Sequence, residues 1–433
     1  MSKRADLESQ SVVATSTRPA PLAGASASSR PGNSQAVGFL PNLCANAFAR
    51  ALLIYLCLNV ALACFYAPAA KTVTAEFRQA DLCDPVSAQL RKPWPWWLAR
   101  GFITCTPPPD VVVFGSSQMG SAQATADAKF LSRWVDVVTH RKIEFLADQL
   151  KQRLHWSPTV LSLAVPGAVI SDEYLMTRSL FTAASRPSLV VITVAPRDFI
   201  DDTLPSACAT DQFKFFSKFV KLGELEQVAY GDLFARGDAK LKELPFRVMG
   251  TELERLLKPE VPADTPGARA VLHAIGAVAT DPSPGQWVVP PVMPNVWSDN
   301  TVEYKHRFKG PNMDHYRVQM QFLATWLADL EKAGVKALVV GMPSLEMNRE
   351  LLPSGFWQRF RGDLSEQCGA YHADWMDLSA DSSFVKADFL DTVHLNDKGS
   401  TKLFPLIAAR IQSAAHLQAR TAPAVNRMLA RQP

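Results

Sequence analysis

The stretch Asp110-Val-Val-Val-Phe-Gly-Ser-Ser-Gln-Met-Gly120 decides the fold. Its three valines and the phenylalanine form a short, fully apolar run, which is typical of a buried parallel strand. The run ends at Gly115 in small polar residues, and a helix-like segment follows. In a doubly wound sheet, ligands and chemistry gather at the carboxyl ends of the strands. A serine hydroxyl at this turn is therefore well placed to act as a nucleophile.

Strand-like and helix-like patterns alternate from Asp110 onward. Further strands are expected at 160–165, 188–194, 336–341 and 371–378. Helices are expected at 128–154, 172–184, 319–332 and 403–417. The alternation predicts an α/β fold, a flavodoxin-like three-layer sandwich in which helices cover both faces of a parallel sheet of about five strands.

Residues 199–310 interrupt this alternation. They contain many prolines, scattered aromatic residues and two helix-like pieces, near 211–228 and 238–257. We interpret them as an insertion beside the active-site edge of the sheet, either a lid or a substrate platform. A separately folded domain is the alternative, although its apolar pattern is thin.

The segments before Asp110 differ in composition. Residues 1–47 are rich in Ser, Ala, Pro and Gly and predict a disordered tail. Residues 421–433 are expected to form a C-terminal tail. Residues 48–68 hold an uncharged apolar run at the lower edge of the length that spans a membrane. We expect a transmembrane signal anchor there, with the amino terminus in the cytoplasm and the main domain extracytoplasmic; a buried core helix is the alternative.

Residues 69–109 are expected to form an irregular connector. The prolines of Lys92-Pro-Trp-Pro-Trp-Trp97 argue against a regular helix. The tryptophans of this stretch are expected to cap the domain, to lie at a membrane interface or to pack under a loop.

Composition excludes several classes of function. A net charge of +4 is too small and too dispersed to indicate a nucleic-acid partner. The histidines show no metal-binding spacing, and no glycine-rich phosphate loop occurs, so we expect neither a metal nor another cofactor. No pair of cysteines has the C-x-x-C spacing; Cys83 with Cys105, or Cys208 with Cys368, are candidate disulfides for an extracytoplasmic domain.

The candidate nucleophile has candidate partners far downstream, in Asp391-Thr-Val-His394. A serine needs a base within hydrogen-bonding distance, and an imidazole titrates in the right range. A carboxylate three residues before the histidine can hold its tautomer and stabilise the imidazolium. Both residues follow the last expected strand, so they should emerge at the same sheet edge as Ser117. His315, which precedes a helix, is the other histidine that could line this site.

The arrangement resembles the SGNH, or GDSL-type, hydrolase family. The first block of that family, Gly-Asp-Ser, is similar to Gly115-Ser116-Ser117, which makes Ser117 the nucleophile and Ser116 its neighbour in the site. The glycine of the second block corresponds to Gly167, and the Asp-x-x-His of the fifth block to Asp391 and His394. The resemblance covers about 110–200 and 311–415 and implies a catalytic domain at 110–420 interrupted by the insertion 199–310.

The third block departs from the family. Ala195-Pro-Arg197-Asp198 has an arginine where the family has the asparagine of its oxyanion hole. The resemblance therefore implies backbone amides of Ser117 and Gly167 as oxyanion donors, and leaves three roles for Arg197. It could serve as the third donor, bind an anionic substrate, or pair with Asp198.

The serine variant of the first block, the anchor and the insertion are similar to membrane-anchored SGNH proteins that acylate surface polymers, such as D-alanyl transfer proteins and alginate O-acetyltransferases. The resemblance implies a single-pass cell-membrane protein that passes an acyl group from Ser117 to a glycan or other polymer, beside a multi-pass membrane acyltransferase. Two alternatives remain open. One is an esterase acting on small or lipid esters, and the other is a catalytically inactive scaffold of an acylation complex.

Overall fold

The structure is a computed structural model, and it describes residues 47–65, 72–73, 92–154, 157–231, 237, 282–294 and 296–413. The expected tails, the insertion helix expected near 238–257 and most of the connector before residue 92 lie outside the described residues, apart from a few positions. By its contacts the chain divides into two compact units, 1–61 and 62–433.

The first described element is helix α2, Ala47–Phe65, whose position agrees with the segment 48–68. Asn59 is the one polar residue in the middle of its apolar run, and its side-chain amide donates to the carbonyl of Tyr55 at 2.8 Å. Within the described part of the chain, no helix combines the length and the apolar character needed to cross a membrane. The signal anchor stays a prediction.

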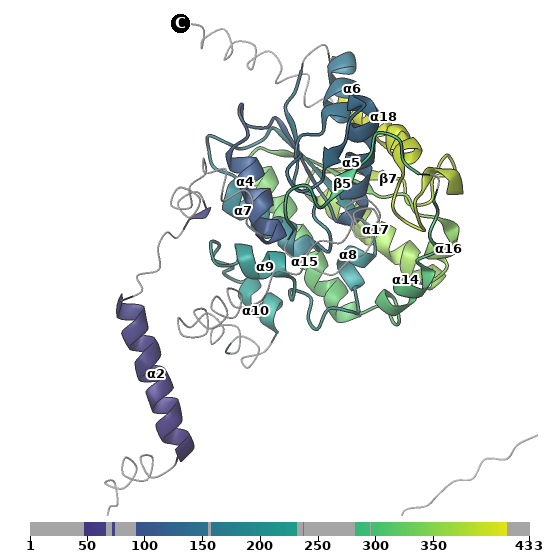
Figure 1. The fold of residues 1–433 in the computed structure, drawn as a ribbon. Helices are drawn as coiled ribbons and strands as arrows, with labels where there is room; N and C mark the ends of the chain where they lie inside the picture. The colour runs from purple at the N-terminus through teal and green to yellow at the C-terminus, as the bar shows by residue number, and fades with distance from the viewer. Residues whose placement is uncertain are drawn as a thin grey trace, which may run out of the picture. The chain divides into compact units, whose positions relative to one another are not determined.

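A five-stranded sheet lies at the centre of the second unit (Figure 1). Every neighbouring pair of strands is parallel, and the order is β3-β1-β4-β6-β7. Counted along the chain, these strands follow the order 2-1-3-4-5, which is that of flavodoxin-like folds. The strands are β1 Val111–Phe114, β3 Val160–Ser162, β4 Leu189–Val194, β6 Lys336–Gly341 and β7 Asp374–Asp377. The predicted parallel sheet of five strands is confirmed.

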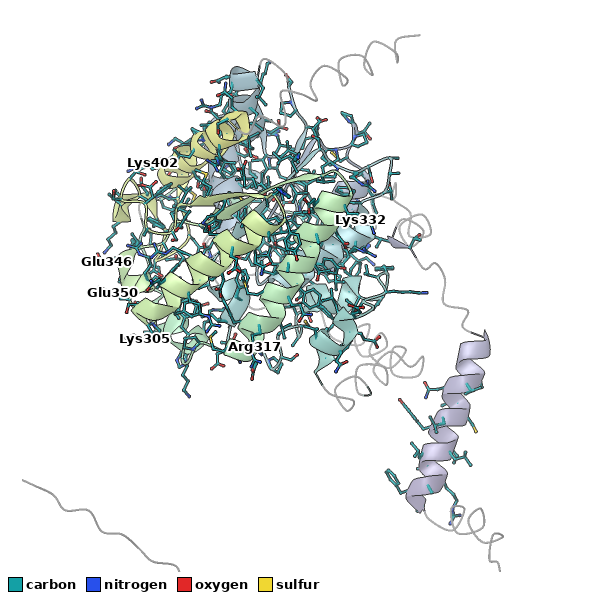
Figure 2. The ribbon with its side chains drawn as sticks, turned by 180° about the vertical axis from the view of Figure 1, so that it is seen from behind. Lys305, Arg317, Lys332, Glu346, Glu350 and Lys402 are labelled. Atoms are coloured by element: carbon teal, nitrogen blue, oxygen red, sulfur yellow. The ribbon has the colours of Figure 1, made fainter. Side chains whose placement is uncertain are left out.

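Side chains of β1 alternate between two apolar clusters, as the period of a strand requires. Val111 and Val113 pack against one group of helices, and Val112 and Phe114 against another. The first group is α5 Ser117–Leu131, α6 Glu144–Leu154 and α18 Asp397–Ser413. The second is α4 Trp94–Ile103, α7 Ile170–Leu180, α15 Met313–Lys332 and α17 Ser354–Ala370. Figure 2 views the second face, with Arg317 and Lys332 towards opposite ends of α15. Helices therefore cover both faces of the sheet.

The helix expected at 128–154 is wrong, because the structure has two helices there. α5 begins at Ser117 and ends where Ser132 adopts a left-handed conformation, φ 52°. The short strand β2, Val135–Asp136, then pairs antiparallel with β5, Val288–Val289, from the insertion. The partner strand lies about 150 residues away, so no local pattern announces this pairing.

The expected irregular connector is wrong for residues 94–103, which form α4. Pro93 precedes the helix and Pro95 lies in its first turn, where a backbone N–H has no partner inside the helix. Trp94, Trp96 and Trp97 are buried in the core. The structure agrees with packing under a loop: Trp97 Nε1 donates to the carbonyl of Pro282 at 3.1 Å, and the ring of Trp94 contacts that of Trp287.

The described parts of the insertion share the main core and do not form a core of their own. Phe213, Trp287 and Tyr304 belong to the same apolar cluster as the α7 and α15 side chains. The helices here are α8 Arg197–Ile200, α9 Asp211–Phe216, α10 Leu225–Tyr230 and α14 Thr301–Arg307. Two short helices, α9 and α10, thus replace the single piece expected at 211–228.

Two further differences concern the last third of the chain. Helix α17 was not expected, although Phe356, Phe360, Leu364 and Cys368 repeat every four residues on its buried side. The closing helix begins at Asp397, six residues before the expected start, and contains Pro405. Cys208 and Cys368 are buried free thiols, so the disulfide considered between them does not form.

Candidate active site

Ser117 is the first residue of α5, directly after the turn that follows β1. This turn is so tight that position 115 has no room for a side chain. A Cβ there would lie 2.1 Å from Thr193 Oγ1 and 2.7 Å from Met119 Cβ. The Ser117 hydroxyl is therefore presented at the carboxyl edge of the sheet and at the positive end of a helix dipole, where developing negative charge is favoured.

Asp391 and His394 lie in one loop between β7 and α18. One carboxylate oxygen of Asp391 accepts hydrogen bonds from the backbone N–H groups of Val393 and His394, both at 2.8 Å. The other oxygen lies 2.7 Å from His394 Nδ1. Main-chain N–H groups of the loop thus fix the carboxylate of Asp391, and the carboxylate orients the imidazole of His394. Both side chains are buried, with exposures of 0% for Asp391 and 1% for His394.

His394 Nε2 lies 2.9 Å from Ser117 Oγ, although the two residues are 277 positions apart in the chain. Two contacts between α5 and the region after the histidine hold this approach. The hydroxyl of Ser121 donates to the carbonyl of Leu395 at 3.2 Å. One turn further along α5, the hydroxyl of Thr125 lies 2.8 Å from that of Ser400. The structure therefore brings together all three residues of the predicted triad.

Two asparagine side chains, one from the insertion and one from the region after β6, also bind the loop that carries Asp391 and His394. Asn300 accepts a hydrogen bond from the backbone N–H of Thr392 at 3.1 Å and a second from its hydroxyl. The amide of Asn348 donates to the same hydroxyl at 3.0 Å. Neither asparagine was expected, because a single Asn in a loop has no distinctive sequence pattern.

Gly167 lies in the turn after β3, with φ at +81°, a left-handed conformation that favours glycine. Within the described residues, neither the N–H of Gly167 nor that of Ser117 donates to a protein acceptor. The carbonyls of Gly167 and Ala168 accept hydrogen bonds from Arg197, at 3.2 Å and 2.6 Å. The carbonyl groups of the turn therefore point towards Arg197, and the N–H of Gly167 is left available as a hydrogen-bond donor.

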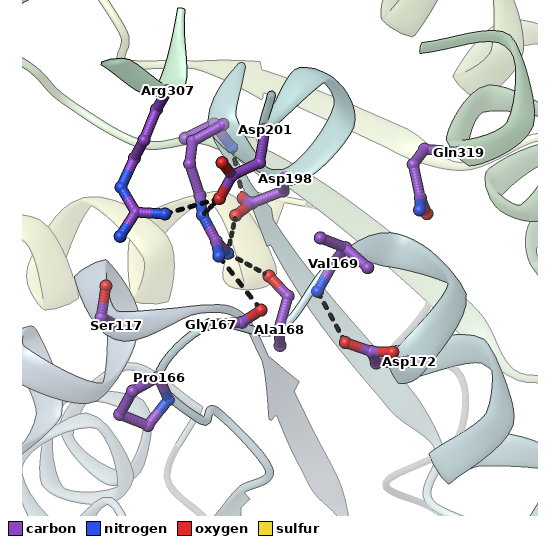
Figure 3. A network of polar contacts seen from close by, with 12 residues as sticks. Ser117, Pro166, Gly167, Ala168, Val169, Asp172, Asp198, Asp201, Arg307 and Gln319 are labelled. Atoms are coloured by element: carbon purple, nitrogen blue, oxygen red, sulfur yellow. Dashed lines mark hydrogen bonds and ion pairs between the residues drawn. The ribbon is translucent and has the colours of Figure 1, made fainter. Parts of the chain in front are cut away.

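Arg197 is 8% exposed and is engaged by protein groups. Figure 3 labels three residues of this network, Gly167, Ala168 and Asp201. Its Nε donates to Asp201 at 2.9 Å, whereas its nearest approach to Asp198 is 3.6 Å. Arg307 donates to the same Asp201 oxygen at 2.6 Å. Burial opposes the charge of Asp201, but Arg197 and Arg307 outweigh it and hold the pKa of that carboxyl below its ordinary value. Of the three roles considered for Arg197, ion pairing is present, chiefly with Asp201.

Asp198 and Ser116 lie in the interior beside this network. Asp198 accepts a hydrogen bond from the backbone N–H of Ala195 at 2.9 Å. Burial raises its pKa to about 6, against the opposing effects of Arg197, the Ala195 N–H and the Ser116 hydroxyl. Ser116 is 4% exposed. Asp198 therefore carries less negative charge at mildly acidic pH than an exposed carboxylate.

His315, considered as a further residue of the site, contacts this network through Asp201. Its Nδ1 lies 3.2 Å from the carbonyl of Asp201, and no contact joins it to the candidate triad in the described structure. Asp201 and Arg307 were not expected. The spacing of Arg197 and Asp201, four residues apart, was a usable signal for an ion pair on a helical turn.

A search of the described residues finds no group of three or more His, Cys, Asp and Glu side chains that could hold a metal ion. In comparisons with known proteins, no family model matches the chain, and no curated protein is significantly similar to it.

Proposed function

We propose that this protein is a serine-dependent enzyme of the SGNH type that transfers an acyl group from an ester to a hydroxyl acceptor or to water. The observation that carries the proposal is the unbroken line of contacts from Ser117 Oγ through His394 to Asp391. A buried aspartate on one imidazole nitrogen and a serine hydroxyl on the other are the parts that nucleophilic catalysis by serine requires.

The mechanism begins when His394 Nε2 takes the proton of Ser117 Oγ as that oxygen bonds to the ester carbonyl carbon. Asp391 stabilises the imidazolium, and the free N–H groups of Ser117 and Gly167 are the donors for the oxyanion. The carbon–oxygen bond to the leaving alcohol then breaks, and His394 gives that alcohol the proton. The acyl group stays on Ser117 until an acceptor hydroxyl, activated by His394, attacks it and releases the serine.

The acceptor that we propose is an exported or cell-surface glycan or polymer, and the proposed partner is a multi-pass membrane acyltransferase. The support is the resemblance of the Ser117, Gly167 and Asp391–His394 blocks to SGNH proteins that acylate such polymers. Hydrolysis differs from transfer in the acceptor alone, so an acceptor screen separates the two.

The test is turnover of p-nitrophenyl acetate by the full-length protein in detergent. Ser117→Ala and His394→Ala should each lower kcat/KM at least about 100-fold, because each removes one partner of the proton transfer. Ser365→Ala, on the exposed side of α17, is the matched control and should keep the rate. Full activity in both site variants would refute the proposal. Labelling of Ser117 by a fluorophosphonate gives a second readout that needs no turnover.

A further inference from the structure

The start and the end of the insertion meet beside the candidate site. Asp201 and Asp202 lie at its start, and Arg307, 106 positions after Asp201, lies near its end. Arg307 Nη1 donates to a carboxylate oxygen of Asp201 at 2.6 Å (Figure 3). The carbonyl of Arg307 accepts a hydrogen bond from the N–H of Asp202 at 3.0 Å. The insertion therefore closes at its base through an ion pair with the buried Asp201 and a backbone hydrogen bond.

Contacts lead from this base to the turn that carries the proposed oxyanion donor. The Asp201 oxygen that accepts from Arg307 also accepts from Arg197 Nε, at 2.9 Å. Arg197 in turn donates to the carbonyls of Gly167 and Ala168. Because both arginines share one carboxylate oxygen, the position of Arg307 helps to set where Asp201 lies, and with it where Arg197 meets the turn.

The opposite end of α14 binds the loop that carries Asp391 and His394. Asn300, the residue before α14, accepts hydrogen bonds from the backbone N–H of Thr392, at 3.1 Å, and from its hydroxyl. Two residues earlier, the N–H of Ser298 donates to the carbonyl of Leu390 at 2.8 Å. One short segment of the insertion, 298–307, thus contacts the histidine loop at its start and the oxyanion network at its end.

The 298–307 segment is held in place by the core. A helix of seven residues, such as α14, is too short to be stable on its own in water. Tyr304 and Phe308 bury their rings in the main apolar cluster and contact each other at 5.4 Å between ring centroids. Glu303 accepts from Nε and Nη2 of Arg307, at 3.0 Å and 2.8 Å, and fixes that guanidinium opposite Asp201. The helix is therefore seated as one body with a fixed side chain at each end.

We propose that the 298–307 segment sets the spacing between the base, His394, and the oxyanion donor, the N–H of Gly167. The inference rests on the proposed function, because the two groups need a fixed spacing only if one reaction uses both. Asn300 and Arg307 act through the histidine loop and through Arg197, so they are positioning residues. The insertion then has a role in assembling the site, in addition to any role in admitting a substrate.

The first test is turnover of p-nitrophenyl acetate by the full-length protein. Asn300→Ala and Arg307→Met should each lower kcat at least about 10-fold with a smaller change in KM, because misplaced groups matter most in the transition state. Arg307→Met leaves Asp201 paired with Arg197, so no buried carboxylate loses its last countercharge. An unchanged kcat in either variant would overturn the proposal.

Lys305→Met is the matched control, because Lys305 is a long cation on the same helix but is exposed (Figure 2). It should keep the wild-type kcat. Glu303→Gln keeps the test available if Arg307→Met does not fold. It weakens the hold on Arg307 without removing the guanidinium and should lower kcat at least about 3-fold. An unchanged kcat in Glu303→Gln would count against the proposal.

Double variants test whether the segment acts as a unit. If one body sets the spacing, the loss of either end already destroys it, so Asn300→Ala combined with Arg307→Met should stay within about 3-fold of the slower single variant. Asn348→Ala is the contrast, because Asn348 binds the same Thr392 hydroxyl from α16, Glu346–Arg349. Combined with Arg307→Met, it should show the product of the two single effects. Multiplied effects in both pairs would overturn the proposal.

Hydrogen exchange separates this inference from the proposed function, because it needs no turnover. The amides to follow are 168–169 in the turn and 393–394 in the loop, all hydrogen-bonded in the folded protein. Asn300→Ala should speed exchange in both segments, and Lys305→Met in neither. This result with an inactive wild type would count against the enzyme and support the positioning role. An active wild type, with faster exchange in Asn300→Ala confined to 393–394, would support the enzyme and overturn the positioning role.

Discussion

Gly115 is the residue on which the turn from β1 into α5 depends. A methyl group there would lie 2.1 Å from the hydroxyl oxygen of Thr193 and 2.7 Å from Met119 Cβ. Thr193 cannot turn away freely, because its hydroxyl donates to the carbonyl of Phe114 at 2.8 Å. Two neighbouring strands and the nucleophile helix therefore meet at a position where glycine alone fits.

Gly115→Ala should destabilise the fold by about 1–3 kcal/mol, the usual cost of overpacking a core. Gly362→Ala is the matched control, since Gly362 lies in α17 with no atom within 4 Å of its Cβ position. That change should stabilise the fold by up to about 1 kcal/mol, as alanine favours helix. Unfolding in urea measures both changes. Equal urea midpoints for wild type and Gly115→Ala would contradict the prediction, because they would show that the turn accommodates a methyl group with no loss of stability.

The turn around Gly167 is the element that presents the proposed oxyanion donor. Side chains from two different helices hold its residues 167–169. Arg197 of α8 donates to the carbonyls of Gly167 and Ala168, and Asp172 of α7 accepts from the N–H of Val169 at 2.9 Å. Asp201 in turn orients Arg197. Arg197 is thus a positioning residue for the turn.

Arg197→Met should lower kcat for p-nitrophenyl acetate at least about 10-fold with a smaller change in KM, because the misplaced amide of Gly167 matters most in the transition state. Arg186→Met is the control: Arg186 also donates to a backbone carbonyl, that of Ala333 at 3.2 Å, but is exposed. A purely structural role would change thermal stability and leave kcat of the folded protein unaffected. An unchanged kcat in Arg197→Met would refute the positioning role.

The folded domain buries carboxyl groups that keep their protons to a higher pH than exposed carboxyl groups do. Glu173 is 1% exposed, and neither of its carboxylate oxygens has a hydrogen-bond partner among the described residues. Burial raises its pKa well above the ordinary value, with further contributions from Asp198 and Asp172. Burial also raises the pKa of Asp172 to about 7. The folded state therefore binds more protons than the unfolded chain above pH about 4.

Because the native state holds these extra protons, the contribution of these two groups to the free energy of unfolding should be most favourable below about pH 4 and fall as pH rises through 7. Glu173→Gln replaces one of these titrating carboxyl groups with a neutral amide of nearly the same size. The variant should match the wild type within about 1 kcal/mol near pH 4 and exceed its stability by about 1–3 kcal/mol at pH 8. Glu366→Gln, exposed on α17, is the control and should follow the wild type. The prediction would be contradicted if the free energies of unfolding of Glu173→Gln and wild type differed by the same amount at pH 4 and pH 8.

The sequence by itself predicted the parallel sheet and the meeting of the candidate triad. Strand β6 has the bounds expected for it, 336–341, because a buried strand is an uninterrupted apolar run that ends where polar residues begin. Ser117 and the Asp391–His394 loop were expected to meet because parallel strands place their carboxyl ends at one edge. Both inferences need only local patterns and one rule of topology.

Tertiary structure alone decided what depends on contacts between distant residues. β2 becomes a strand because β5 arrives from the insertion, and Arg197 turns to Asp201 and two carbonyls because these lie within its reach in the folded chain. The guanidinium of Arg141 is likewise buried, with its Nη2 unpartnered among the described residues, only because distant segments pack around it. Local propensity acts over a few residues, whereas burial, ion pairing and cavities arise where segments far apart in the sequence pack together.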